Sequence, residues 1–184
     1  QRPIAEKFIA DLTKSMSAFV VGRGTDATTT LGASVSVKER NKIAELVDQS
    51  IAAGAKVETG GKTPDGVGAF YPATVLSVAK DNPILKHEIF GPVAPVVIFD
   101  TDAEGIALAN DTEFGLISYV FSSNLARALR TAEAMESGMV AINKGVISDP
   151  AAPFGGVKQS GLGREGGFDG IHEFLQTKYI GVQI

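Results

Sequence analysis

Segments with helical periodicity alternate with strand-like segments along this sequence, and this order restricts the possible folds more than any other feature. Two capping boxes, Ser36–Glu39 and Thr101–Glu104, each predict the start of a helix. Short runs rich in β-branched and aromatic residues predict strands at residues 56–58, 71–78, 93–99, 116–121 and 139–143. Such alternation is typical of an α/β fold, and we predict a mostly parallel open sheet covered by helices.

The spacing of apolar residues predicts the helices, and the composition of the last seven residues predicts a further strand. Helical spacing predicts helices at residues 4–12, 37–51 and 125–136, with Ser123 as the N-cap of the last one. Residues 178–184 have strand composition at the end of the sequence, where an unpaired edge invites pairing with another chain. We therefore expect residues 1–177 to form one domain and residues 178–184 to form a C-terminal oligomerisation strand.

Charge and apolar patterns argue against two classes of partner. The net charge is -4, and the sequence has no cluster of Lys and Arg that would bind nucleic acid. Pro92, Pro95 and Asp100 interrupt the longest apolar run, so no membrane span is expected. The first residues lack a basic region followed by an apolar one, and we therefore expect a cytoplasmic protein.

The sequence contains no cysteine. Disulfides, thiolate metal sites and a cysteine nucleophile are therefore excluded within these residues. The two histidines, His87 and His172, lie far apart and without the spacing of metal ligands. We expect no metal site.

The stretch Ser148–Gly167, which we call the glycine-rich loop, is too long to be a simple connection. Loops of this length usually carry function or are disordered, and its apolar residues favour an ordered loop packed over a site. Gly161, Gly163 and Gly166 match the pattern G-x-G-x-x-G, which binds a pyrophosphate only when it follows a buried strand and opens a helix. Residues 157–160 do not read as such a strand, so we interpret these glycines as hinges leading into a short helix at residues 168–175.

Four motifs in a fixed order provide a family resemblance. They are EIFGP at residues 88–92, NDTEFGL at 110–116, GMVAIN at 138–143 and PFGGVKQSGLGRE at 153–165. Together they resemble the carboxyl-terminal, catalytic-domain part of the aldehyde dehydrogenase family over nearly the whole sequence. Residues 145–148, GVIS, further resemble the succinate-semialdehyde dehydrogenase subgroup.

The resemblance implies an enzyme that oxidises an aldehyde with NAD or NADP. In this family a cysteine thiolate attacks the aldehyde, hydride passes to the nicotinamide, and water activated by a glutamate hydrolyses the thioester. The nucleophile, the base and the main cofactor domain lie upstream of the part resembled here, so we assign no catalytic residue and expect these residues alone to be inactive. The family also implies a small aldehyde substrate and a homo-oligomer.

Two residues fall on cofactor-binding positions of the family. Glu88 matches the carboxylate that accepts hydrogen bonds from the nicotinamide ribose, and Phe90 matches the ring that packs beside the nicotinamide. Without the resemblance, Glu88 would be an ordinary solvated charge and Phe90 a core residue ahead of a strand. His87 departs from the acidic residue that is common before this glutamate.

Two residues of the glycine-rich loop fall on substrate-binding positions. Ser148 matches the hydroxyl that the succinate-semialdehyde subgroup offers to the distal carboxylate of its substrate, and Phe154 is expected to line the aldehyde channel. A serine before Asp-Pro is also a routine turn former, and Phe154 could equally be a loop anchor. Asp149 is a departure that would repel a carboxylate if it pointed toward the substrate.

Two other hypotheses compete with a semialdehyde dehydrogenase. One is a non-catalytic homologue that serves as an assembly or ligand-binding module, with its terminal strand paired to a partner. The other is a dehydrogenase for a different aldehyde.

Overall fold

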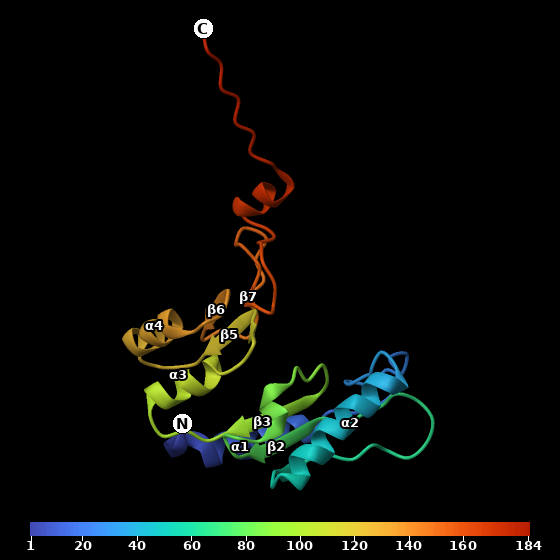
Figure 1. The fold of residues 1–184 in the computed structure, drawn as a ribbon. Coiled ribbons are helices and arrows are strands. Elements are labelled where there is room, and N and C mark those ends of the chain that lie inside the picture. The colour runs from blue at the N-terminus through green and yellow to red at the C-terminus, as the bar shows by residue number, and fades with distance from the viewer. The chain divides into compact units, whose positions relative to one another are not determined.

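The computed structural model describes residues 1–184, and the chain forms two compact units, Gln1–Thr101 and Asp102–Ile184 (Figure 1). The first unit contains α1 (Arg2–Ser17), α2 (Val37–Ala52), β1 (Lys56–Thr59), β2 (Thr74–Val78), a 3₁₀ helix η1 (Pro83–Lys86) and β3 (Val93–Val97). The second contains α3 (Asp102–Asn110), β4 (Phe114–Gly115), β5 (Ile117–Val120), α4 (Leu125–Ala134), β6 (Met139–Ile142), β7 (Val157–Lys158) and η2 (Asp169–Phe174).

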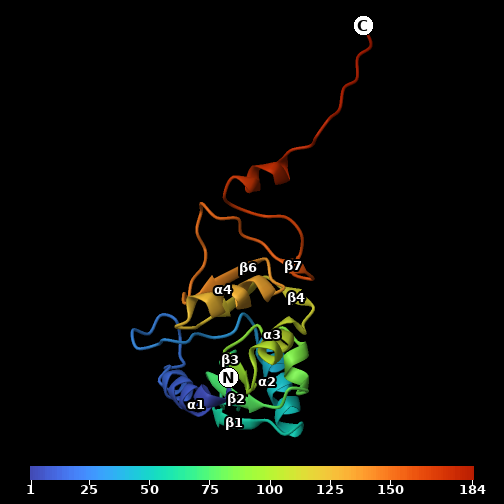
Figure 2. The same cartoon turned by 90° about the vertical axis from the view of Figure 1, so that its left-hand side faces the viewer.

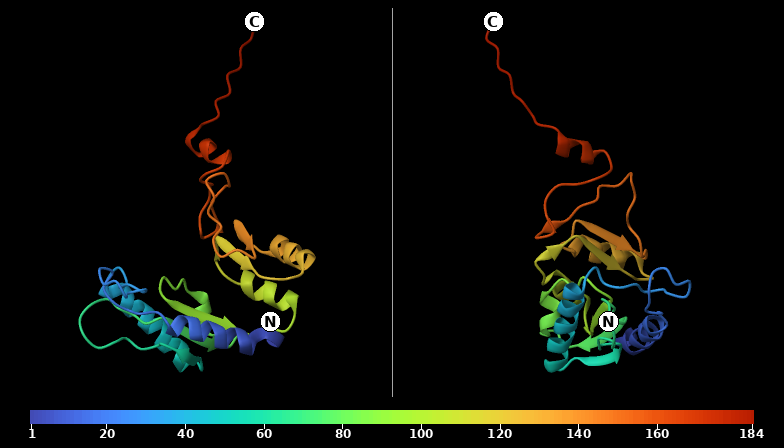
Figure 3. Two further views of the ribbon diagram at one scale, coloured as in Figure 1. Left: turned by 180° about the vertical axis from the view of Figure 1, so that it is seen from behind. Right: turned by 90° about the vertical axis from the view of Figure 1, so that its right-hand side faces the viewer.

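The first unit is built around a sheet with the strand order β1-β2-β3. Strand β1 runs antiparallel to β2, and β3 runs parallel to β2 with Thr74 opposite Val93. The sheet lies between α1 and α2, as Figures 2 and 3 show from several sides. Its buried apolar cluster consists of Ile43, Val47, Tyr71, Leu76 and Ile84. The predicted N-cap of α2 is confirmed, because Ser36 Oγ accepts a hydrogen bond from the Glu39 amide at 3.2 Å.

The second unit contains two small sheets. Strands β5 and β6 are parallel, with Ile117 opposite Met139, and α4 is the crossover between them. Strands β4 and β7 form an antiparallel pair of two residues each. Few apolar residues are buried in this unit, and they are Ala128, Met139 and Ala141.

The predicted single, mostly parallel sheet is not what the chain forms. The structure has three small sheets, in which two strand pairs are parallel and two are antiparallel. A parallel connection needs a crossover, usually a helix, but residues 60–73 between β1 and β2 contain none. The chain therefore reverses there, and β1 pairs with β2 in the antiparallel sense.

The predicted strand at residues 178–184 also does not form. These residues have no secondary structure, and Tyr179 is 91% exposed. A strand needs a hydrogen-bonding partner, and none of the chain's own strands pairs with this segment. Its role in oligomerisation stays a prediction.

The helix prediction for residues 125–136 needs a smaller correction. Asn124, and not Ser123, is the N-cap of α4, since Asn124 Oδ1 accepts the Arg127 amide at 3.0 Å, and the helix ends at Ala134. None of the helices combines the length and apolar character that crossing a membrane requires.

Candidate functional site

The glycine-rich loop folds back on itself as an ordered hairpin. Phe154 and Glu165 form an isolated antiparallel bridge, in which each backbone amide donates to the other residue's carbonyl at 2.7 Å. The Gly167 amide also donates to the Pro150 carbonyl at 3.0 Å. These bonds place the first and last parts of the loop side by side.

The three glycines of the G-x-G-x-x-G pattern all adopt left-handed backbone conformations. Their φ angles are 102° at Gly161, 87° at Gly163 and 68° at Gly166. Side chains rarely tolerate such values, so these positions favour glycine for conformational reasons. The pattern follows the two-residue strand β7, a different setting from the buried strand and helix start that a dinucleotide fingerprint requires.

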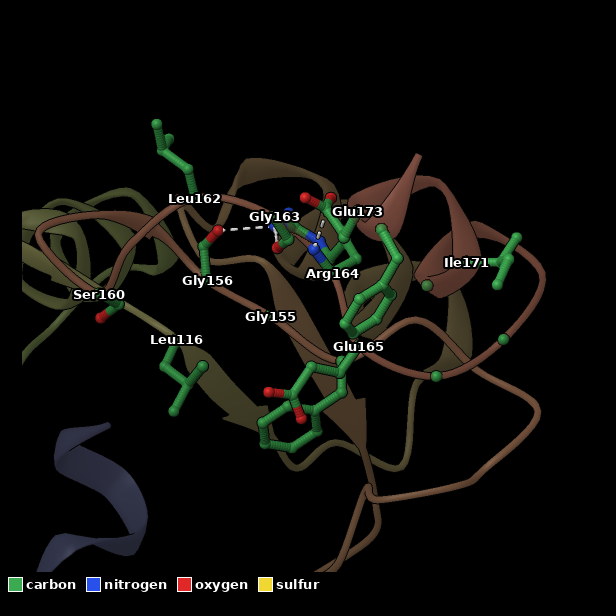
Figure 4. Close-up of a pocket in the computed structure, with 15 residues that line it drawn as sticks. Leu116, Gly155, Gly156, Ser160, Leu162, Gly163, Arg164, Glu165, Ile171 and Glu173 are labelled. Carbon is green, nitrogen blue, oxygen red and sulfur yellow. Dashed lines mark hydrogen bonds between the residues drawn. The ribbon is translucent and has the colours of Figure 1, made fainter. Parts of the chain in front are cut away.

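A cavity of about 820 Å³ opens between this hairpin and η2. Phe154, Leu162, Ile171 and Phe174 are among its apolar lining residues, and Arg164 supplies a positive charge. Figure 4 shows the Arg164 guanidinium beside two backbone carbonyls, and its Nη1 donates to those of Gly156 and Gly163 at 2.7 Å each. The cavity therefore combines apolar walls with charged groups, since Glu165 and Glu173 line it as well as Arg164, whose guanidinium is held by the loop itself.

Arg164 is also fixed through its backbone. Glu173 of η2 accepts the Arg164 amide at 3.1 Å through Oε1. This contact ties the short helix to the hairpin. Sequence reasoning missed both residues, because a contact between a backbone amide and a carboxylate nine positions away across a glycine-rich loop has no periodic signature.

The two predicted substrate residues lie on the same segment. Phe154 is half-buried and lines the cavity, whereas Ser148 is exposed and does not. The neighbouring Asp149 uses Oδ1 to accept the Ala151 amide at 2.9 Å, and its carbonyl accepts the Ala152 amide at 3.0 Å. Asp149 is thus engaged in a local turn directly after Ser148.

The two predicted cofactor residues lie in the first unit, between η1 and β3. Glu88 is exposed, and the Phe90 ring is 86% exposed. An accessible carboxylate can accept two hydroxyl donors, and a bare aromatic ring can pack on a flat heterocycle. These side chains therefore fit the ribose and ring of a nicotinamide cofactor.

A buried polar pair supports the start of this segment. Ser50 Oγ donates to Asn82 Oδ1 at 2.8 Å, and Asn82 Nδ2 donates to the Ser50 carbonyl at 3.1 Å. Asn82 Oδ1 also accepts the Ile84 amide and so caps η1. Because η1 ends at Lys86, this pair fixes the backbone two residues before Glu88.

Comparison with known proteins decides the family. Residues 1–180 match the aldehyde dehydrogenase family. The chain belongs to this family. Among its relatives, the succinate-semialdehyde dehydrogenase of Paenarthrobacter nicotinovorans is 49% identical over 183 residues, which cover 99% of this chain and 41% of that protein.

Solved aldehyde dehydrogenases have the same fold. The crystal structure of succinate-semialdehyde dehydrogenase from Burkholderia pseudomallei is 44% identical, with a TM-score of 0.88 over 93% of this chain and 36% of that one. Betaine aldehyde dehydrogenase from Staphylococcus aureus, solved in complex with NAD+, is 39% identical, with a TM-score of 0.91 over 98% of this chain and 37% of that one. This aldehyde dehydrogenase chain thus spans about two fifths of the length of the relatives it matches.

Proposed function

We propose that this chain is part of an NAD(P)-dependent aldehyde dehydrogenase that oxidises succinate semialdehyde to the dicarboxylic acid. The observation that carries the proposal is the 49% identity to a succinate-semialdehyde dehydrogenase over 99% of the chain. Within the proposal, residues 1–177 belong to the catalytic domain and residues 178–184 serve oligomerisation. The enzyme would be a cytoplasmic homo-oligomer with a small aldehyde as its substrate.

Two residues would bind the cofactor, NAD or NADP, which accepts hydride when bound. The exposed Glu88 carboxylate would accept hydrogen bonds from the nicotinamide ribose and so fix its orientation. The Phe90 ring, 86% exposed, would pack beside the nicotinamide and lose its contact with water. The NAD+ complex of the related betaine aldehyde dehydrogenase supports this family cofactor.

Two residues would bind the substrate. The exposed Ser148 hydroxyl would donate to the distal carboxylate of the semialdehyde, and Phe154 would line its aliphatic part. Asp149 keeps its negative charge beside Ser148, but its Oδ1 accepts the Ala151 amide and so belongs to a local turn. The cysteine nucleophile and the general base would lie in a part of the enzyme outside these residues, since the chain has no cysteine.

The Ser148→Ala substitution tests the substrate. A hydrogen bond to a charged group is worth roughly 1.5 to 3 kcal/mol, which corresponds to a 10- to 100-fold fall in kcat/KM for succinate semialdehyde. An uncharged aldehyde of similar length should be turned over unchanged. If Ser148→Ala lowered kcat/KM equally for both aldehydes, or for neither, the carboxylate contact would be contradicted and Ser148 would be a turn-forming residue only.

A different aldehyde is the second candidate. It is favoured by the match to a betaine aldehyde dehydrogenase and by the negative charge of Asp149 beside Ser148. A panel of an anionic, a neutral and a cationic aldehyde distinguishes the two, because the highest kcat/KM should follow the charge that the site accepts. A longer protein that includes both this chain and a cysteine could be tested in the same way. If it turned over none of these aldehydes, the result would favour a non-catalytic module.

A further inference from the structure

Segment 144–157, which runs from just after β6 to the first residue of β7, is bordered at both ends by a non-glycine residue in a left-handed conformation. Asn143 has a φ of 52° and Lys158 a φ of 56°, and they are the only non-glycine residues with positive φ. Left-handed conformations of such residues persist only where surrounding contacts hold them, and they gather at functional sites. The segment between them carries both Ser148 and Phe154.

Asn143 is held by a two-way contact with Ser122. Its Oδ1 accepts the Ser122 amide at 2.9 Å, and its Nδ2 donates to the Ser122 carbonyl at 2.9 Å. The Asn143 amide also donates to the Val120 carbonyl at 2.9 Å. The direction in which the chain leaves β6 is therefore set by the end of β5.

Lys158 is held by its ammonium group. Nζ donates to the carbonyls of Asn110 and Thr112 at 2.9 and 3.2 Å and forms an ion pair with Glu136 at 2.7 Å. Asn110 is the last residue of α3, where the negative end of the helix dipole favours a cation. The Lys158 side chain is 26% exposed and its partner Glu136 is 60% exposed, so water partly screens the ion pair.

A lysine has no intrinsic preference for this backbone conformation. Asparagine visits it through local hydrogen bonds, but lysine does so only when its side chain is fixed elsewhere. The three contacts of the ammonium group supply that constraint. They hold β7 against β4, and with it the hairpin that contains the Phe154–Glu165 bridge.

We propose that Asn143 and Lys158 are positioning residues that fix the two ends of segment 144–157 and thereby hold Ser148 and Phe154 in place for the aldehyde. The assignment to the aldehyde rests on the proposed function. The mechanical part, a segment anchored at both ends by side chains, does not depend on it. Two measurements therefore test the parts separately.

The mechanical part is tested by amide hydrogen exchange in the 184-residue chain. Lys158→Met keeps the aliphatic stem and removes the ammonium, and Asn143→Gly keeps the backbone conformation and removes the side chain. Each should speed exchange of the Phe154 and Glu165 amides about tenfold or more. Lys158→Met removes the hydrogen bonds and the ion pair of the ammonium group, and Asn143→Gly removes the two side-chain hydrogen bonds to Ser122, so the hairpin that carries these amides opens more often. Exchange in β5 and β6 should stay within about threefold of the wild-type chain.

Matched variants separate anchoring from loss of charge or of folding. Lys42→Met removes a lysine whose Nζ pairs only with the exposed Glu39 on α2, and it should leave both loop amides unchanged. Lys158→Arg keeps the cation and should restore most of the protection. Unchanged exchange at Phe154 and Glu165, or an equal increase throughout β5 and β6, would overturn the anchoring.

The positioning role is tested by kinetics in the active enzyme that contains this chain. Lys158→Met and Asn143→Gly should raise KM for the aldehyde about 10-fold and leave KM for the cofactor unchanged, since the described contacts of Asn143 and Lys158 do not include Glu88 or Phe90. Loop amides that exchange faster while aldehyde KM stays constant would overturn the positioning role. The hydrogen-exchange test does not depend on which aldehyde is the substrate. If succinate semialdehyde is not turned over, KM is compared for the aldehyde that is.

Discussion

Gly138 lies against the backbone of the glycine-rich loop. A Cβ atom at this position would lie 2.1 Å from the Gly155 carbonyl oxygen and 2.9 Å from the Gly156 Cα. Because these are backbone atoms in a hairpin closed by hydrogen bonds, they cannot rotate away as a flexible side chain would. Gly138 therefore permits the close approach of the loop to the start of β6.

Replacing this glycine should separate the loop from β6. We expect Gly138→Ala to lower the free energy of unfolding of the second unit by roughly 1 to 3 kcal/mol, the usual cost of overpacking. Urea unfolding followed by a probe in this unit measures the change. Gly145→Ala, just beyond the other end of β6, is the control, because Gly145 has no atom within 4 Å of the added Cβ and no positive φ. Equal losses for the two variants would contradict the role of close approach.

Tyr71 is a buried polar residue without a partner. Its side chain is 1% exposed, and its hydroxyl makes no hydrogen bond. Burial raises the pKa of the Tyr71 phenol from 10.0 to about 12, and the charge of Asp48 adds to this increase. The folded chain therefore keeps this phenol neutral at a pH where the unfolded chain ionises it.

The sign of the pH dependence follows from this difference. The stabilisation is fully present below pH 10.0 and is lost as the pH rises to about 12. We expect the free energy of unfolding to fall by roughly 2 kcal/mol over that window in the wild-type chain, and by clearly less in Tyr71→Phe. At neutral pH the variant should be as stable as wild type or about 1 kcal/mol more stable, because no hydrogen bond is lost. Tyr119→Phe, at a tyrosine that is 47% exposed, controls for the loss of a tyrosine hydroxyl outside the core.

Among the elements, the start of α4 is a case where sequence reasoning failed by one residue. Both Ser123 and Asn124 are good N-cap residues, and sequence preference does not separate neighbours of this kind. The structure decides through geometry, because Asn124 Oδ1 reaches the Arg127 amide and Ser122 supports the turn by accepting the Asn124 amide at 3.2 Å.

A pair of single substitutions tests this assignment. Asn124→Ala should destabilise the second unit by about 1 kcal/mol, the typical value for a lost N-cap, whereas Ser123→Ala should have an effect within about 0.5 kcal/mol. Thermal unfolding monitored by helical circular dichroism measures both. A larger loss of stability for Ser123→Ala than for Asn124→Ala would contradict the assignment and support Ser123 as the N-cap of α4.

Local signals predicted the elements better than their pairing. The capping box at Ser36 and the strand-like runs near Thr74, Val93 and Met139 all correspond to observed elements, because caps and β-branched runs act within a few residues. Pairing depends on contacts between distant strands, and nothing within residues 56–58 specifies that β1 runs antiparallel to β2. The prediction of one mostly parallel sheet failed for this reason.

Site residues were predictable only through motifs. Glu88, Phe90, Ser148 and Phe154 were named from a family resemblance, and the structure adds that Phe154 lines a cavity. Asn82 was missed although an Asn before a Pro is a helix-start signal, and it does cap η1. Arg164 and Glu173 were missed because their hydrogen bonds to backbone groups across a loop leave no residue pattern in the sequence.

At the scale of the whole molecule, many large apolar side chains are exposed. Phe90, Phe174 and Tyr179 are 86%, 87% and 91% exposed, respectively. Exposed apolar residues that stand singly are normal on a folded chain, whereas contiguous apolar patches mark places where protein or ligand is bound. The chain spans 41% of a related enzyme, and within the proposed function the Phe90 ring would be covered by the nicotinamide.

The last prediction concerns activity of these 184 residues by themselves. We expect no oxidation of succinate semialdehyde with either NAD or NADP, because the proposed reaction needs a thiolate and the chain has no cysteine. Its three methionines carry thioethers, which lack an ionisable proton and cannot replace the thiolate. Formation of reduced cofactor, followed at its near-ultraviolet absorbance with each cofactor, is the measurement, and mass spectrometry excludes a longer contaminating enzyme. Aldehyde-dependent turnover by the pure chain would show that its chemistry does not use a cysteine, and it would remove the main reason for assigning the nucleophile to another part of the enzyme.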